Sequence, residues 1–144
     1  MADAGTVKNL LTETNRCVLM TRRRDGGFQS SPMAVVADDD GNLLFSTRQT
    51  AVKVKNLQRD PYAAACIITE KFLGAWLHVE GTAKIEFLPE AMPALADFYR
   101  RRSTEDTESD AFAQRMRDEG RCLIRVRTEK VVQPPPRPPA RASA

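Results

Sequence analysis

The pattern of apolar and polar positions predicts several strands joined by tight turns. Residues 16–22 and 28–36 are strand-like runs on either side of a turn at Asp25, Gly26 and Gly27, where the glycines accept positive φ without steric cost. A second turn at 38–42 precedes a short apolar run at 43–46, and 62–69 suits a buried strand. Because Pro32 lacks a backbone donor, we expect the second run to be interrupted there or to lie at a sheet edge.

The second half of the chain mixes strands with helices. Residues 76–87 predict a long strand bent near Gly81, and 121–127 predict a final strand. Helical spacing of apolar residues occurs at 6–14, in a stripe beginning at Met92, and at 109–119, where Gly120 ends the pattern. This order argues for a small antiparallel barrel with helices packed outside it, and against a doubly wound sheet.

Composition is that of one ordinary globular domain. The 144 residues are 42% hydrophobic and 28% charged, enough chain to bury a real core. We expect this domain at residues 1–133, followed by a proline-rich flexible tail at 134–144, for which a polyproline ligand of a partner protein is the alternative. The sequence holds no apolar run of about 18 residues and begins without a secretory signal pattern, so we expect a cytoplasmic protein with no membrane span.

Charge and titratable residues exclude several classes of function. The net charge is +3, and the basic clusters at 22–24 and 100–102 are offset by acidic runs without interleaved aromatic residues, which argues against a nucleic-acid partner. The three cysteines lack metal or redox spacing and are expected to be buried free thiols. His78 is the only histidine, expected as a structural residue in the barrel interior or at a subunit interface. We therefore predict no metal site and no catalytic side chain.

The stretch from Ser46 to Pro61 is the best candidate for a binding site. It follows an apolar strand, begins with two hydroxyl residues and continues into a short basic helix. Val52, Val54 and Leu57 are expected to anchor this helix. Backbone N–H groups at a helix start and nearby ammonium groups act on the same anion. A solvated basic helix is the alternative interpretation of the same residues.

The order of motifs resembles the flavin and deazaflavin split β-barrel proteins related to pyridoxamine-phosphate oxidase. The matching segments are 18–21, 25–27, 31–33, 44–47, 53–61 and 79–83. The segment Asn56-Leu57-Gln58-Arg59-Asp60-Pro61 is the most specific of them. The resemblance implies a mainly β (α+β) fold, a six-stranded antiparallel split β-barrel of the FMN-binding type with peripheral helices. It also implies a homodimer with two cofactor sites at the subunit interface.

The resemblance also assigns cofactor-binding residues by position. One strand segment would lie along the cofactor ring through backbone contacts, hydroxyls of the next strand would donate to it, and the basic helix would bind its phosphate. A tryptophan would reach the site from the same or the partner chain. These residues are, in that order, Ser31, Pro32, Met33, Ser46, Thr47, Lys53, Lys55, Asn56 and Trp76.

The resemblance further implies the chemistry. The chain looks like the branch that uses the deazaflavin F420, including actinobacterial members, and no counterpart of the Arg-x-His segment of pyridoxamine-phosphate oxidases is found. The implied activity is an F420-dependent oxidoreductase that transfers hydride from the reduced deazaflavin to a small organic acceptor such as an enone or quinone. Two alternatives stay open: an FMN-dependent oxidoreductase of the same fold, and a non-catalytic F420-binding or carrier protein. Since such a cofactor carries its own reactivity, the protein need only bind and orient it.

Overall fold

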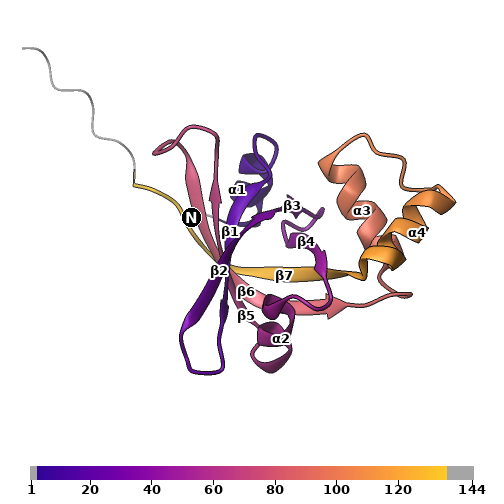
Figure 1. Ribbon diagram of the computed structural model, residues 1–144. Coiled ribbons are helices and arrows are strands. Elements are labelled where there is room, and N and C mark those ends of the chain that lie inside the picture. Colours follow the sequence, from indigo (N-terminus) through magenta and orange to yellow (C-terminus); the bar gives the residue numbers. More distant parts are fainter. Residues whose placement is uncertain (1–2, 136–144) are drawn as a thin grey trace, which may run out of the picture.

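The computed structural model describes residues 3–135, which form one curled sheet with four helices around it (Figure 1). The helices are α1 (Ala4–Leu10), α2 (Val52–Arg59), α3 (Met92–Arg102) and α4 (Asp110–Glu119). The strands are β1 (Arg16–Arg22), β2 (Phe28–Ala34), β3 (Val36–Ala37), β4 (Leu43–Arg48), β5 (Tyr62–Ile68), β6 (Trp76–Glu86) and β7 (Arg121–Val132).

The sheet is antiparallel throughout and almost closes on itself. Its order is β2-β1-β5-β6-β7-β4-β3, and β2 at one end of that order contacts β4 near the other. Only Leu43 and Leu44 of β4 pair with β3, so the rest of that edge of β4 lies beside β2 without ladder bonds. We call this opening, between β2 and the 45–48 portion of β4, the seam.

The sheet has seven strands, so the expectation of six was wrong. Residues 28–36 have the extended pattern of one strand, but the chain changes partner within them. Residues Phe28–Ala34 pair with β1, whereas Val36–Ala37 pair with β4 at the far end of the sheet order. Between them the Val35 amide donates to the Asn15 carbonyl. A hydrophobic pattern reports which residues are extended, not which strand each one pairs with.

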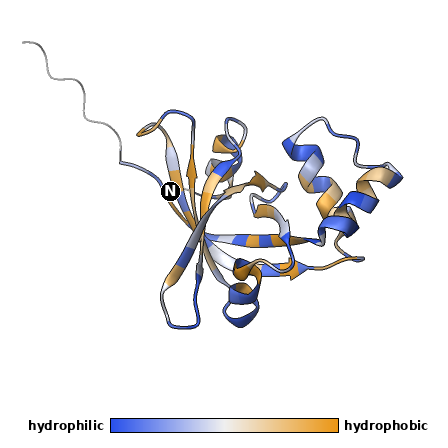
Figure 2. Cartoon of the chain, viewed as in Figure 1, coloured by the Kyte–Doolittle hydropathy of each residue, from blue (hydrophilic) through white to orange (hydrophobic). Residues whose placement is uncertain are grey.

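Two apolar clusters lie on the two faces of the curled sheet. The inner cluster fills the half-barrel with residues from β1, β4, β5, β6 and β7, including Leu19, Phe45, Ile67, Val79 and Ile124. The second cluster packs α3 and α4 against the outer side of β4 and β7. Figure 2 shows the resulting amphipathic colouring of these two helices, which lie side by side on the outside of the half-barrel.

Several local expectations from the sequence are confirmed. Ser109 caps α4 by accepting from the Phe112 amide, and Gly120 ends that helix in the left-handed region at φ 61°. Pro32 lies on an edge strand. The ladder between β6 and β7 shifts register between Glu80 and Gly81, and a Cβ at Gly81 would lie 1.7 Å from the Arg127 carbonyl oxygen. Glycine is required there because the β7 backbone occupies the place of a side chain.

The expected tail at 134–144 lies almost wholly outside the described residues, so its separation from a domain at 1–133 stays a prediction. Among the described helices, none is long and apolar enough to cross a membrane.

Candidate functional site

Two buried polar atoms without partners mark the inner face of β2. The Ser31 hydroxyl oxygen and the Gln29 side-chain carbonyl oxygen are buried and accept no hydrogen bond from any described residue. Both side chains lie on the inner face, because Gln29 pairs with Thr21 and Ser31 pairs with Leu19, whose side chains face the core. Buried polar atoms are rarely left unpaired, so this pair indicates a place where a ligand can supply the missing donors.

The three expected β2 residues divide between the two faces of the strand. Met33 packs against the inner cluster, and Ser31 lies on the same side. Pro32 lies between them on the opposite, exposed side. A ligand in the seam would therefore meet Ser31 and Met33 through their side chains, and Pro32 only through its backbone.

The two hydroxyls of β4 also point to opposite faces. Thr47 is buried and alternates with the inward-facing Phe45. Ser46 faces outward, where its hydroxyl lies 3.0 Å from the Tyr99 hydroxyl of α3. One ligand in the seam can use Thr47 directly, whereas Ser46 already has a partner on the helical side.

The third group of expected residues belongs to α2, which follows β4 after a short loop. The helix begins after Ala51, and no side-chain hydrogen bond caps its first turn. Val54 and Leu57 anchor it as expected, but Val52 is 59% exposed and does not. Because residues two apart on a helix do not face one another, Lys53 and Lys55 lie on different sides of α2.

Lys53 is the lysine that turns toward the sheet. Burial raises the pKa of the Cys122 thiol to about 11, and the positive charges of Arg121 and Lys53 pull that pKa down in part. Cys122 pairs with Thr47 across β4 and β7, so the Lys53 charge acts on the part of the sheet that carries Thr47. Lys55 is exposed.

Asn56 fixes α2 to β1. Its side-chain amide is buried, donates to the Thr21 hydroxyl over 3.1 Å and accepts from Arg59 over 3.1 Å. Thr21 pairs with Gln29 of β2, so Asn56 lies on the same inner face as the unpaired Gln29 oxygen. Its side chain acts mainly as a bridge between the helix and the sheet, and its part in phosphate binding stays a prediction.

Trp76 lies far from the other expected residues within one chain. It is the first residue of β6, whereas Ser46 is level with the last, since Ser46 and Glu86 both pair with Leu123. Ten residues of strand span about 33 Å when fully extended. Trp76 instead lines a pocket of about 310 Å³ beside α1. It can take part in the seam only from a partner chain.

The structure therefore brings together Ser31, Met33, Thr47, Lys53 and Asn56 around the seam, and separates Pro32, Ser46, Lys55 and Trp76 from it. Sequence reasoning missed Gln29, for which strand alternation with Ser31 was the available signal.

The single histidine lies on the outer face of the sheet, not in the barrel interior. His78 alternates with the buried Leu77 and Val79, and its Nε2 lies 2.9 Å from a carboxylate oxygen of Glu80. The Tyr62 hydroxyl donates to the other oxygen of that carboxylate over 2.7 Å. These hydrogen bonds, from Tyr62 first and His78 second, lower the pKa of Glu80, and the same contact raises the pKa of Tyr62.

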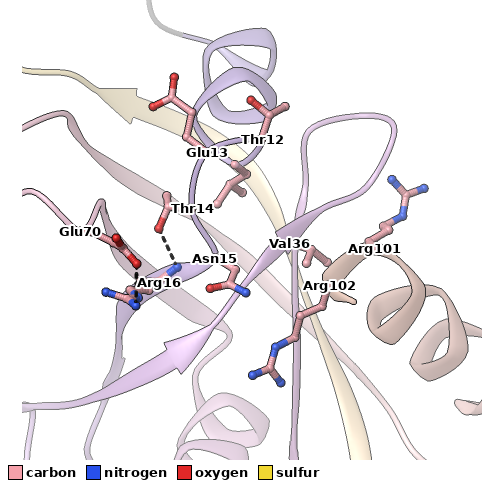
Figure 3. A pocket seen from close by; sticks show the side chains of 10 residues that line it. Thr12, Glu13, Thr14, Asn15, Arg16, Val36, Glu70, Arg101 and Arg102 are labelled. Atoms are coloured by element: carbon pink, nitrogen blue, oxygen red, sulfur yellow. Dashed lines mark hydrogen bonds and ion pairs between the residues drawn. The ribbon is translucent and has the colours of Figure 1, made fainter. Parts of the chain in front are cut away.

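Other hollows of the surface lie away from the seam. A polar pocket of about 280 Å³ lies between the end of α1, the start of β1, Val36 of β3 and the last residues of α3. Figure 3 shows the side chains that line it. Arg16 and Glu70 form an ion pair of 3.1 Å across part of it. The described residues include no group of three or more His, Cys, Asp or Glu side chains placed to hold a metal ion.

Comparison with known proteins identifies the fold and the family. A conserved hypothetical protein from Mycobacterium tuberculosis superposes with a TM-score of 0.72 at 20% identity, over 92% of this chain and 84% of that one. A structure described as an F420 reductase gives 0.63 at 22% identity, over 86% and 94% of the two chains. An FMN-binding protein related to pyridoxamine 5'-phosphate oxidase, from Nostoc punctiforme, gives 0.61 at 13% identity, over 89% and 78%.

No curated protein matches this sequence. Residues 4–133 match the family described as pyridoxamine 5'-phosphate oxidase. This match covers both sides of the seam and every expected site residue, so the resemblance to that family is confirmed. The chain belongs to the pyridoxamine 5'-phosphate oxidase family.

Proposed function

We propose that the protein is an oxidoreductase that binds F420 in the seam and uses it to pass hydride to a small organic acceptor. The observation that carries the proposal is the pair of unpartnered buried oxygens of Gln29 and Ser31, together with the uncapped start of α2, which bears Lys53. The residues fit a cofactor that carries ring N–H groups at one end and a phosphate at the other. A bound flavin or deazaflavin supplies the hydride chemistry.

The protein's own residues bind and orient the group. The oxygens of Gln29 and Ser31 accept hydrogen bonds from the ring edge, and the unpaired backbone edges of β2 and β4 add directional contacts. The Lys53 ammonium group and the first amides of α2 hold a phosphate, which a helix start favours. Met33 and the inner cluster exclude water from one side of the ring.

A homodimer completes this proposal. The outer face of β1, β5 and β6 is rich in apolar residues, and the exposed fractions of Ile68 and Val132 at its margin are both 40%. A second copy packed on this face would cover Val18 and Cys66, which share one row across β1 and β5. A partner chain would also be the source of Trp76 near the seam.

FMN is the second candidate cofactor, because a structural neighbour is described as FMN-binding. Both cofactors present a ring and a phosphate, so the seam suits either. The non-catalytic alternative is a protein that carries F420. It would bind the cofactor through the same contacts but would not transfer hydride to an acceptor.

Titration of the purified protein against F420 and FMN tests the proposal. We expect F420 to bind more tightly. Lys53→Ala should weaken binding at least about tenfold, taking roughly 1.5 kcal/mol for one charge-assisted contact. Lys55→Ala is the matched control, since it removes the same charge from the other side of the helix. The Lys53→Ala, Lys55→Ala double variant should bind the cofactor about as weakly as Lys53→Ala alone. Absence of binding to both cofactors would overturn the proposal, and tighter binding of FMN would favour the second candidate.

Turnover is tested separately with reduced F420 and a panel of enones and quinones. Oxidation of the cofactor that depends on the acceptor is expected. Tight binding without any acceptor-dependent oxidation would indicate the carrier function.

A further inference from the structure

An arginine-lined groove lies at the C-terminal end of α2, whereas the proposed phosphate position lies at the start of that helix. The groove has a volume of about 650 Å³ and runs between the tip of the β1–β2 hairpin and the junction of α2 with β5. Figure 2 shows this hairpin tip as hydrophilic. The eight residues of α2 span about 12 Å, which separates the groove from the phosphate end of the proposed cofactor site.

Four guanidinium groups and one carboxylate line this groove. The arginines are Arg22, Arg23, Arg24 and Arg59, and the carboxylate is Asp60. Arg22 and Arg23 have ion-pair partners in Asp60 and Asp25. Within residues 3–135, Arg24 and Arg59 form no ion pair with a carboxylate. The groove therefore carries a surplus of positive charge toward any ligand.

Three of the four arginines are already held in place. Arg59 donates to the Arg22 carbonyl over 2.8 Å and to Asn56 over 3.1 Å. Arg22 stacks over the Tyr62 ring at 4.3 Å. Arg23 donates to Asp25 and to the Phe28 carbonyl. Side chains fixed before binding lose less conformational entropy when a ligand arrives, so this arrangement favours binding.

An aromatic ring completes the groove. Phe28 lines it and is 54% exposed, so its ring is accessible to a ligand in the groove. Its ring offers a stacking surface for a planar base. Arginine matches phosphate oxygens with two parallel hydrogen bonds, and the described lining includes no lysine.

We propose that this groove is a second small-molecule site, which binds a nucleoside diphosphate or triphosphate. The phosphates contact Arg24 and Arg59, with Arg22 and Arg23 beside them, and the base stacks on Phe28. The volume lies within the usual range of ligand sites. The groove is formed by residues of one chain and does not use the proposed cofactor.

Calorimetric titration of the full chain with four probes tests the proposal. The probes are ADP, adenosine, tripolyphosphate and pentaglutamate, at low and at physiological salt. We expect ADP to bind more tightly than the other three, with an affinity that falls as salt rises. Pentaglutamate that binds as tightly as ADP would overturn the assignment to phosphate, as would an absence of ADP binding.

Two variants separate the charge from the ring. Arg24→Ala should weaken ADP binding about tenfold, and folding should be unaffected because its side chain is exposed. Phe28→Ala should weaken ADP binding by roughly tenfold and leave tripolyphosphate unchanged. Arg117→Ala on α4 removes the same charge far from the groove and is the matched control.

The same titrations distinguish this site from the seam. Lys53→Ala should leave ADP binding unchanged, and Arg24→Ala should leave cofactor binding unchanged. If Lys53→Ala abolishes ADP binding while Arg24→Ala and Phe28→Ala have no effect, ADP occupies the seam and the groove proposal is wrong.

Discussion

At the scale of single residues, an unpaired buried atom is informative because it is costly. The Ser31 hydroxyl oxygen gains no hydrogen bond from the described part of the chain, and burying such a group costs on the order of 1–3 kcal/mol. In the proposed function, a bound cofactor supplies the donor that this oxygen lacks.

The first prediction follows from that cost. Ser31→Ala should leave the stability of the ligand-free protein unchanged or raise it by up to about 1 kcal/mol. It should also weaken cofactor binding by roughly fivefold to tenfold, as one neutral hydrogen bond is lost. Urea unfolding and cofactor titration measure the two effects. Ser30→Ala, on the exposed face of the same strand, should change neither, and a destabilised ligand-free Ser31→Ala variant would count against the idea.

Asp38 is the opposite case, a buried carboxylate with every partner it needs. Its oxygens accept from the amides of Asp40 and Asn42, from the Asn42 side chain and, over 2.7 Å, from Arg125. Burial alone would raise the pKa of Asp38, but these hydrogen bonds outweigh it and hold the pKa below its ordinary value. The acidic run at 38–40 is therefore a turn fixed to β7, as the sequence predicts for 38–42.

The second prediction uses this network. Asp38→Asn should lower the free energy of unfolding by about 2–3 kcal/mol at pH 7. Because the folded pKa is lowered, the contribution of Asp38 is fully present above its unfolded-state pKa of about 3.9 and is lost as pH falls through the folded value. The stability gap between the native protein and the variant should shrink below about pH 4. Urea unfolding at pH 7, 5 and 3 measures it, with the exposed Asp40→Asn as control, and a gap of equal size at pH 3 would contradict the assignment.

At the scale of elements, sequence pattern and turn chemistry predict most of the secondary structure. The caps of α4, the hairpin at Asp25–Gly27 and the irregularity at Gly81 all follow from local rules. The division of 28–36 into two strands does not, since it depends on pairing with β4, which is distant in the sequence. The same dependence on distant pairing limits the prediction of the site. Strand alternation predicts that Ser46 and Thr47 point to opposite faces. Which side of α2 faces β7, however, is known only once the pairing of β4 with β7 is known.

The third prediction concerns the irregularity between β6 and β7. Gly81→Ala places a Cβ against the Arg127 backbone, which cannot move without disturbing the ladder, so it should destabilise the protein by about 3 kcal/mol. Gly26→Ala is the comparison, because φ there is 89° but nothing lies within 4 Å of the added carbon. It should cost only the backbone strain, about 1–2 kcal/mol. Thermal unfolding of both variants measures the difference in stability. Equal losses of stability would mean that the β7 backbone can shift to make room for a Cβ at position 81.

At the scale of the whole molecule, the half-barrel has one filled face and one incomplete face. The inner side is filled by its own core except along the seam, and α3 and α4 cover the outer side of β4 and β7. The outer side of β1, β5 and β6 has no such cover among the described elements. Apolar side chains there, with the His78–Glu80–Tyr62 hydrogen bonds beside them, form the surface on which we propose that a second copy of the chain packs.

The last prediction tests that surface and the cofactor site together. Val18→Glu introduces a charge at the middle of the outer face, where it would be buried without a partner in a dimer, and should convert dimers to monomers. Because the proposed cofactor site includes the partner's Trp76, cofactor affinity should fall with the loss of the dimer. Light scattering and cofactor titration follow the two effects, and Gln58→Glu, on the exposed side of α2, is the charge-matched control. A Val18→Glu monomer that binds cofactor with native affinity would show that the seam of one chain is sufficient.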